Sequence, residues 1–115
     1  MNKIFVYGKL KKNFFNHTKY GFNMKTKFIK NAILEGYLMY NLGGKPCIVE
    51  TKDKRDIVVG EIYEYFDSDC ERAIKRMEED AGFKETIVTI DGAQVKTFVF
   101  DRKPNNHVIK EGIWR

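Results

Sequence analysis

Only one stretch of the sequence has the clear spacing of an amphipathic helix, and this restricts the fold more than any other feature. In residues 69–80 the apolar side chains recur at i, i+3, i+4 and i+7, the spacing that places them on one helical face. These side chains are Cys70, Ala73, Ile74 and Met77. Asp67-Ser68-Asp69 supplies residues that cap a helix N-terminus, and Ala81-Gly82 ends the pattern. Most of the core must therefore come from strands.

Short segments rich in β-branched and aromatic residues surround this helix and predict strands. The predicted strands are residues 3–7, 32–40, 47–50, 57–66, 86–90 and 95–100. Gly36, in the middle of the second of these, predicts a bulge or a close approach of another backbone. Residues 11–31 lack a clean period and predict a loop with a short helical turn near residues 15–22. Asp91-Gly92 joins the last two strands and is a strong hairpin signal.

This order of segments predicts an α+β fold. The expected architecture is a small, mixed, mostly antiparallel and barrel-like sheet with one main helix. A chain of 115 residues, 43% of them hydrophobic, can build one core but not two. We therefore expect residues 1–115 to form a single domain. The tail from Lys103 is irregular, and Trp114 is large enough to pin it to the domain.

Charge and cysteine content exclude several classes of protein. The net charge is +5, but the basic residues are spread along the chain, whereas a nucleic-acid binder usually shows a basic stripe with aromatics between. We expect no nucleic-acid partner, although a basic protein that binds nucleic acid or an acidic partner stays an alternative. Two cysteines and two histidines without ligand spacing predict no disulfide framework and no metal. An anionic small molecule fits the same charge balance.

The N-terminal sequence indicates in which cellular compartment the protein is expected. Its apolar run, Ile4–Tyr7, is too short for the core of a signal peptide or for a membrane span. We therefore expect a cytoplasmic protein without a membrane partner. Nothing in the sequence indicates an oligomeric state.

Two places in the sequence could carry chemistry. In the turn Tyr7-Gly8-Lys9-Leu10, glycine lets the backbone approach a ligand, and successive N–H groups can form an anion-binding nest. An ordinary turn at the end of a strand is the alternative. Glu78 lies at the border of the helix's apolar face, where partial burial raises a carboxyl pKa and makes a general base. A run of surface acids, Glu78-Glu79-Asp80, is the alternative there.

Other polar residues are weaker candidates. Asn16-His17 in the long loop could contact a ligand. Cys70 falls on the apolar face of the helix and is expected in the core, and no histidine stands near either cysteine in the sequence to activate a thiol.

Several blocks, in order, resemble the gamma-glutamylcyclotransferase-like family, which includes the gamma-glutamylamine cyclotransferases and the plant AIG2-like proteins. Phe5–Leu10 resembles the family's F-V-Y-G-T-L. Lys11–Asn13 resembles its two basic residues and glycine, and Asn16-His17 resembles its N-H pair. Other blocks that resemble family motifs are Gly36–Gly43 with Pro46, Val59–Glu64, Ile74–Glu78 and Ile109–Trp114. The resemblance covers nearly the whole chain.

The resemblance implies a set of site residues. Glu78 matches the family's catalytic glutamate, and the implied substrate contacts are Tyr7, Gly8, Lys9, Leu10, Asn16, Tyr37 and Phe83. Matching Met77-Glu78 to the family's L-D instead would place Ala81 at the catalytic position and imply an inactive protein. Lys9, Lys75 and Phe98 depart from the family pattern, which has threonine or serine, aspartate and often tyrosine there.

The resemblance also implies a reaction. The family cyclises a gamma-glutamyl amide to 5-oxoproline and releases an amine, with the glutamate as base and then acid and with no metal or cofactor. The alternative is a small-molecule-binding module on the same scaffold, in which the departures have removed turnover. Which amine is released is not given by the sequence.

Overall fold

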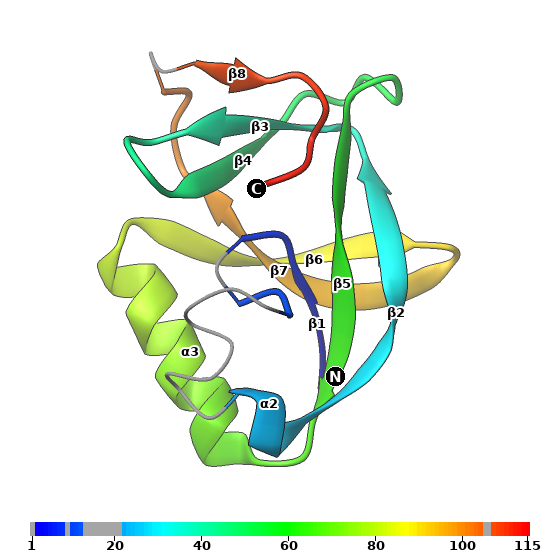
Figure 1. Cartoon of the computed structure of the whole chain (residues 1–115), viewed down its shortest axis with the longest axis vertical. Helices are drawn as coiled ribbons and strands as arrows, with labels where there is room; N and C mark the ends of the chain where they lie inside the picture. Colours follow the sequence, from blue (N-terminus) through cyan, green and yellow to red (C-terminus); the bar gives the residue numbers. More distant parts are fainter. Residues whose placement is uncertain (1, 9, 13–21, 105–106) are drawn as a thin grey trace.

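The computed structural model of the chain describes residues 2–8, 10–12, 22–104 and 107–115. Figure 1 shows two sheets and one long helix in these ranges. The elements are β1 (Lys3–Val6), α2 (Phe22–Lys25), β2 (Thr26–Glu35), β3 (Tyr37–Asn41), β4 (Pro46–Glu50), β5 (Ile57–Tyr65), α3 (Ser68–Asp80), β6 (Phe83–Ile90), β7 (Ala93–Phe100) and β8 (Val108–Ile109).

The larger sheet is built around β1. Ile4, Phe5 and Val6 are all buried, and a strand that is apolar on both faces needs cover on both faces. The strand order is β2-β5-β1-β7-β6, which puts β1 in the centre. β1 pairs antiparallel with β5 and parallel with β7, where the Thr97 hydroxyl donates a 3.0 Å hydrogen bond to the Phe5 carbonyl. The sheet is therefore mixed but mostly antiparallel, as predicted.

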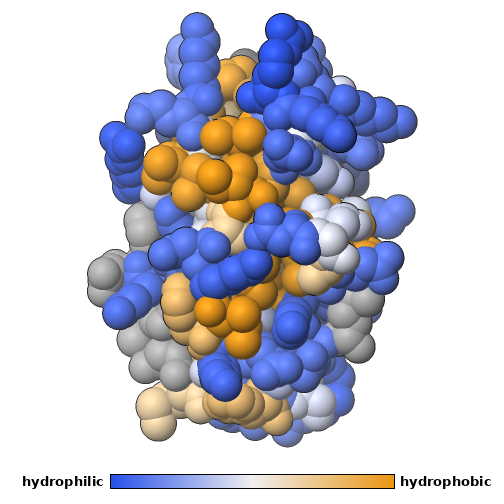
Figure 2. Space-filling view, turned by 90° about the vertical axis from the view of Figure 1, so that its right-hand side faces the viewer, coloured by the Kyte–Doolittle hydropathy of each residue, from blue (hydrophilic) through white to orange (hydrophobic). Residues whose placement is uncertain are grey.

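This sheet curls so that its two edge strands approach each other. Lys30 of β2 forms a 2.7 Å ion pair with Asp91 in the turn between β6 and β7. In the pairings of the described strands, no ladder joins β2 to β6, so the sheet is barrel-like and open. Figure 2 looks onto the side that carries β2 and shows apolar side chains gathered in its middle. Ile33 on β2 and Ile87 on β6 are about half exposed.

The second sheet has the order β4-β3-β8 and begins at Gly36. The prediction of one strand over residues 32–40 is wrong, because Gly36 adopts φ +86° and sends the chain from β2 into β3. Its N–H donates to the Asp56 carbonyl, and its own carbonyl accepts from Thr51 and Lys52, so the corner is fixed on both sides. The predicted loop over residues 11–31 also ends earlier than expected, because β2 starts at Thr26.

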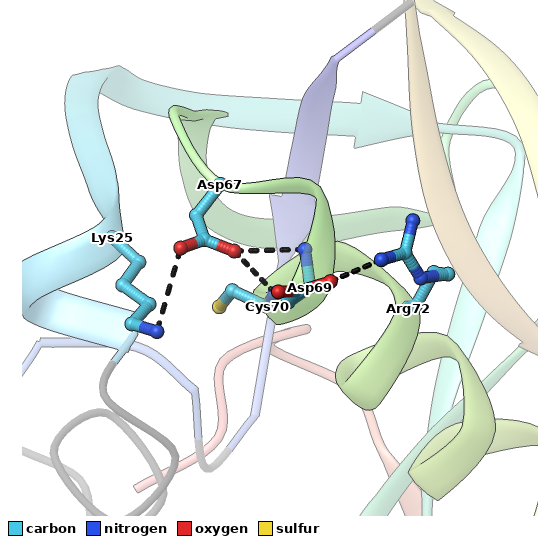
Figure 3. A network of polar contacts seen from close by, with 5 residues as sticks. All are labelled: Lys25, Asp67, Asp69, Cys70 and Arg72. Atoms are coloured by element: carbon cyan, nitrogen blue, oxygen red, sulfur yellow. Dashed lines mark hydrogen bonds and ion pairs between the residues drawn. The ribbon is translucent and has the colours of Figure 1, made fainter.

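The cap of α3 holds the helix against the sheets. One Asp67 carboxylate oxygen accepts from the backbone N–H of Asp69 and Cys70 at 2.8 and 3.0 Å, which satisfies two N–H groups that would otherwise lack partners. Lys25 lies 3.4 Å from the other oxygen, and Arg72 bonds to the Asp69 side chain (Figure 3). Cys70 and Ile74 are buried beneath α3 and Met77 is half-buried, which confirms the helix. Ala73 is exposed, so the buried face is narrower than predicted.

Two groups of buried side chains form the core, one on each face of β1. Ile4 and Val6 belong to the first group with Ile74 of α3, and Phe5 belongs to the second with residues of β3 and β5. Trp114 packs against the second group, and Gly112 accepts a 2.7 Å hydrogen bond from the Val59 N–H. None of the described helices has the length and hydrophobicity needed to span a membrane.

Candidate active site

A pocket of about 220 Å³ opens where the end of β1, the start of β4 and the end of α3 meet. Its walls come from four parts of the chain that are distant in sequence. The lining residues are Ile4, Phe5, Val6, Tyr7, Gly8, Leu10, Lys45, Pro46, Met77, Glu78, Ala81, Phe83 and Phe98. The pocket is therefore mainly apolar, with few polar groups that could orient a ligand.

Glu78 brings a carboxyl group to this pocket from the last turn of α3. Ile74, four residues earlier, is fully buried, so Glu78 stands at the edge of the buried face and is itself half-buried. Burial raises its pKa from 4.5 to about 7, while the positive charge of Lys45 acts in the opposite direction. A carboxyl with this pKa can both take up and return a proton near neutral pH.

Tyr7 forms another wall of the pocket and is locked in place. Its hydroxyl donates a 2.5 Å hydrogen bond to the carbonyl oxygen of Phe98 on β7. Burial and then the negative charge of Glu78 hold the pKa of Tyr7 well above 10. The hydroxyl therefore stays protonated at neutral pH and remains a hydrogen-bond donor.

The turn after β1 depends on Gly8. The Gly8 carbonyl accepts a 3.0 Å hydrogen bond from Lys11, which closes the turn. A Cβ atom at Gly8 would lie 2.6 Å from Cγ of Pro46, closer than real Cβ contacts allow. Glycine is therefore required because β4 begins directly against this turn.

Two lysines anchor the continuation of the turn. The Lys11 ammonium donates a 3.0 Å hydrogen bond to the carbonyl oxygen of Trp114, and the Lys12 N–H donates to Glu61 at 2.9 Å. Burial lowers the pKa of Lys11. These contacts tie the wall of the pocket to the C-terminal tail and to β5.

Lys45 is a pocket residue that the sequence did not single out. It ends a turn in which Leu42 N–H donates to the Lys45 carbonyl at 2.8 Å and Gly44 N–H donates to the Asn41 side chain at 2.8 Å. Its Nζ lies 5.9 Å from the centre of the Phe83 ring. The adjacent Gly43-Gly44 and Pro46 predicted a turn, but nothing local indicated which part of the fold that turn would reach.

Five of the predicted site residues come together in this pocket: Tyr7, Gly8, Leu10, Glu78 and Phe83. Tyr37 does not line it and lies buried in the second core group. Lys9 and Asn16, with its neighbour His17, lie outside the described residues. Further lining residues are Met77, Ala81, Pro46 and Phe98. Ala81 contributes only a methyl group, so Glu78 is the residue that brings a carboxyl group from the end of α3 to the pocket.

The two cysteines are buried and offer no activated nucleophile. Burial raises the pKa of Cys47 to about 11 and also raises that of Cys70. Both thiols therefore stay protonated at neutral pH. Cys70 belongs to the first core group, as its helical spacing predicted.

Comparison with known proteins gives the family of the chain. Residues 4–115 match the family model described as gamma-glutamyl cyclotransferase, AIG2-like. A Methanocaldococcus jannaschii protein, provisionally named a gamma-glutamylcyclotransferase, is 33% identical over 108 residues, which cover 87% of this chain and 83% of the relative.

Solved structures share the fold. An uncharacterised protein from Pyrococcus horikoshii matches with a TM-score of 0.82 and 26% identity, over 98% of this chain and 89% of that one. An AIG2-like protein from Mus musculus matches with a TM-score of 0.76 and 22% identity, over 91% and 80%. The latter likeness concerns the fold alone.

Proposed function

The chain belongs to the gamma-glutamyl cyclotransferase, AIG2-like family, and from this we propose that it converts a gamma-glutamyl amide into 5-oxoproline and a free amine. The observation that carries the proposal is a half-buried carboxyl, Glu78, with a pKa of about 7 in the wall of a mainly apolar pocket. Such a group fits a reaction in which protons are removed from the attacking nitrogen and delivered to the departing one.

The reaction joins two groups of the same molecule. The α-amine of the substrate attacks its own γ-carbonyl carbon, a new C–N bond closes the five-membered lactam, and the bond to the leaving amine breaks. Because nucleophile and carbonyl are already linked, the pocket mainly has to hold the chain folded, and such positioning can contribute roughly 7–11 kcal/mol. The apolar walls from β1 and Phe83 are suited to that task.

Glu78 handles the proton in this proposal. The α-amine arrives as an ammonium and cannot attack until it has lost a proton, which the Glu78 carboxylate accepts. The protonated Glu78 then donates that proton to the departing nitrogen, so the enzyme ends in its starting state. When the lactam forms, the ring nitrogen loses a second proton, and Glu78 passes it to the released amine, which leaves as an ammonium. Atoms and charge then balance without a further reactant.

Backbone N–H groups of the turn at Gly8, Lys9 and Leu10 are the proposed partners of the developing oxyanion or of the α-carboxylate. Gly8 and Leu10 line the pocket, whereas Lys9 lies outside the described residues. The Tyr7 ring closes the wall beside them.

One observation favours a second candidate, a binding module without turnover. Phe98 lines the pocket where many relatives offer a tyrosine hydroxyl, so a polar contact to substrate is missing there. By contrast, Lys75 is exposed and lies 3.8 Å from Glu85, and it does not line the pocket.

Purified protein incubated with a panel of gamma-glutamyl amides, followed by mass spectrometry for 5-oxoproline, tests the proposal. Glu78→Gln keeps the shape but cannot transfer the proton, and we expect turnover to fall by about 10²–10⁴-fold. Glu79→Gln, one position further and exposed, is the matched control and should keep wild-type turnover. Normal turnover by Glu78→Gln would show that Glu78 is not the group that transfers the proton. Binding of 5-oxoproline by the wild-type protein, without product from any amide, would favour the binding module.

A further inference from the structure

The position of Lys45 bears on which amine the pocket accepts. Lys45 is exposed and lines the pocket, whereas Glu78 is half-buried in its wall. The side chain of Lys45 extends over the face of Phe83, with Nζ 5.9 Å from the ring centre. Its backbone is held by the Leu42 N–H bond to the Lys45 carbonyl. A cation therefore stands at the mouth of the pocket on a supported turn.

Among the described residues Lys45 forms no close ion pair, although its charge interacts with that of Glu78. Lys25, Lys30 and Lys96 each lie within 4 Å of an acidic side chain. For Lys45 the ion pairs of the described residues include no such partner. Its positive charge nonetheless acts inside the pocket, because it opposes the rise in the pKa of Glu78 and lowers that of Cys47. Lys45 thus offers a positive charge at the mouth of the pocket.

The geometry of the proposed reaction decides which end of the substrate meets this cation. The α-ammonium has to reach the half-buried Glu78, so the α-carbon and its carboxylate lie inside, beside the turn at Gly8. In the folded, reacting conformation the departing nitrogen also lies within reach of Glu78, and the rest of the leaving amine extends from it toward the mouth. An anionic group on that amine would lie in the field of Lys45.

We propose that Lys45 makes the site selective for gamma-glutamyl amides whose leaving amine carries an anionic group, in preference to those with a neutral or cationic amine. This inference rests on the proposed function, since it names the substrate class of the same pocket. Lys45 acts as a specificity residue: it binds the part of the substrate that leaves and has no share in the proton transfer.

A pair of substrates that differ in one charge tests the inference. Gamma-glutamylglycine and its C-terminal amide have nearly the same size, but only the first carries a carboxylate on the leaving amine. The measured quantity is the ratio of their kcat/KM values. We expect wild-type protein to prefer the acid by about fivefold, the effect of one partly exposed ion pair, and the preference to shrink with added salt.

Three variants make the test specific. Lys45→Met keeps the length of the side chain and should bring the ratio close to one, and Lys45→Glu should reverse the preference toward the amide. Lys27→Met removes an exposed lysine of β2 that does not line the pocket and should leave the ratio unchanged. Because the ratio compares two substrates on one protein, partial unfolding of a variant does not alter it.

The outcomes separate the two proposals. In one outcome both substrates yield 5-oxoproline, and the ratio of their kcat/KM values is the same in wild type and Lys45→Met. This would overturn the role of Lys45 and leave the proposed reaction standing. Absence of 5-oxoproline from both substrates and from the whole amide panel would overturn the proposed function, and this inference with it.

Discussion

The hydroxyl of Tyr7 donates a 2.5 Å hydrogen bond to the carbonyl oxygen of Phe98, a residue 91 positions further along the chain. Both residues line the pocket, and both are buried. The bond fixes the end of β1 against β7 and places one wall of the pocket relative to another. Together with the Thr97 bond to Phe5 and the Lys11 bond to Trp114, this polar contact between distant parts of the sequence fixes the pocket geometry.

Removal of the Tyr7 hydroxyl should weaken the fold more than the turnover. In Tyr7→Phe the ring remains, but the buried Phe98 carbonyl loses its partner, which costs about 1–3 kcal/mol of unfolding free energy. Urea denaturation of the two proteins measures this difference. An unchanged unfolding free energy would mean that another donor replaces the hydroxyl.

The contact between Gly8 and Pro46 predicts a destabilising substitution with a specific rescue. Gly8→Ala places a methyl group against Pro46 Cγ and should cost about 1–3 kcal/mol, as overpacking does. Pro46→Ala removes that Cγ, so the double variant should be less destabilised than the sum of the two single variants. Denaturation of all four proteins completes the double-mutant cycle. If the two changes in unfolding free energy were additive, the added methyl group would destabilise Gly8→Ala through a neighbour other than Pro46.

The pKa of Glu78 predicts the acid limb of the pH–rate profile. As a base Glu78 must be ionised, so kcat/KM should rise with pH and level off above about 7. A fluorescence or mass-spectrometric assay between pH 5 and 9 would give this profile. A midpoint near 4.5 would show that the carboxyl is solvated in the free protein, because kcat/KM reports the pKa values of the free enzyme.

The same pKa links Glu78 to stability. Its pKa is about 7 in the folded protein and 4.5 as its ordinary value, so the native state binds the proton more tightly. This stabilisation is fully present below about pH 4.5 and is lost as pH rises through 7, a change of about 2–3 kcal/mol. The difference in unfolding free energy between wild type and Glu78→Gln, measured across this range, isolates the contribution. A difference that does not vary with pH would exclude burial of the carboxyl.

The strands that are buried on one face or on both could be predicted from the sequence, whereas the first half of β2 could not. Residues 57–66 alternate and match β5 closely. Residues 26–31 of β2 are mostly exposed, with a register shift between Phe28 and Lys30, so no apolar alternation marks them. The corner at Gly36 was predicted as a bulge, because a positive φ at glycine suits either a bulge or a change of sheet.

Glu78 and Lys45, two residues of the candidate site, also differ in whether the sequence predicts them. Glu78 could be predicted because its partial burial follows from the helical spacing of its own segment. Lys45 could not, because its approach to Phe83 depends on how the β3–β4 turn packs against β6. Tyr37 resembled a site residue in sequence, but its strand directs it into the second core group. Local periodicity thus predicts which face a residue occupies but not which distant element it meets.

The place of β1 in the larger sheet has a consequence for how the protein is made. A ribosome releases Ile4, Phe5 and Val6 early, yet their neighbours in the sheet are residues 61–63 of β5 and Lys96 of β7. The strand that becomes the centre of the core cannot pair until most of the chain has been translated. Such high sequence separation slows folding, and in the meantime an apolar segment is exposed to other chains. This exposure follows from the topology alone and is independent of what the pocket binds.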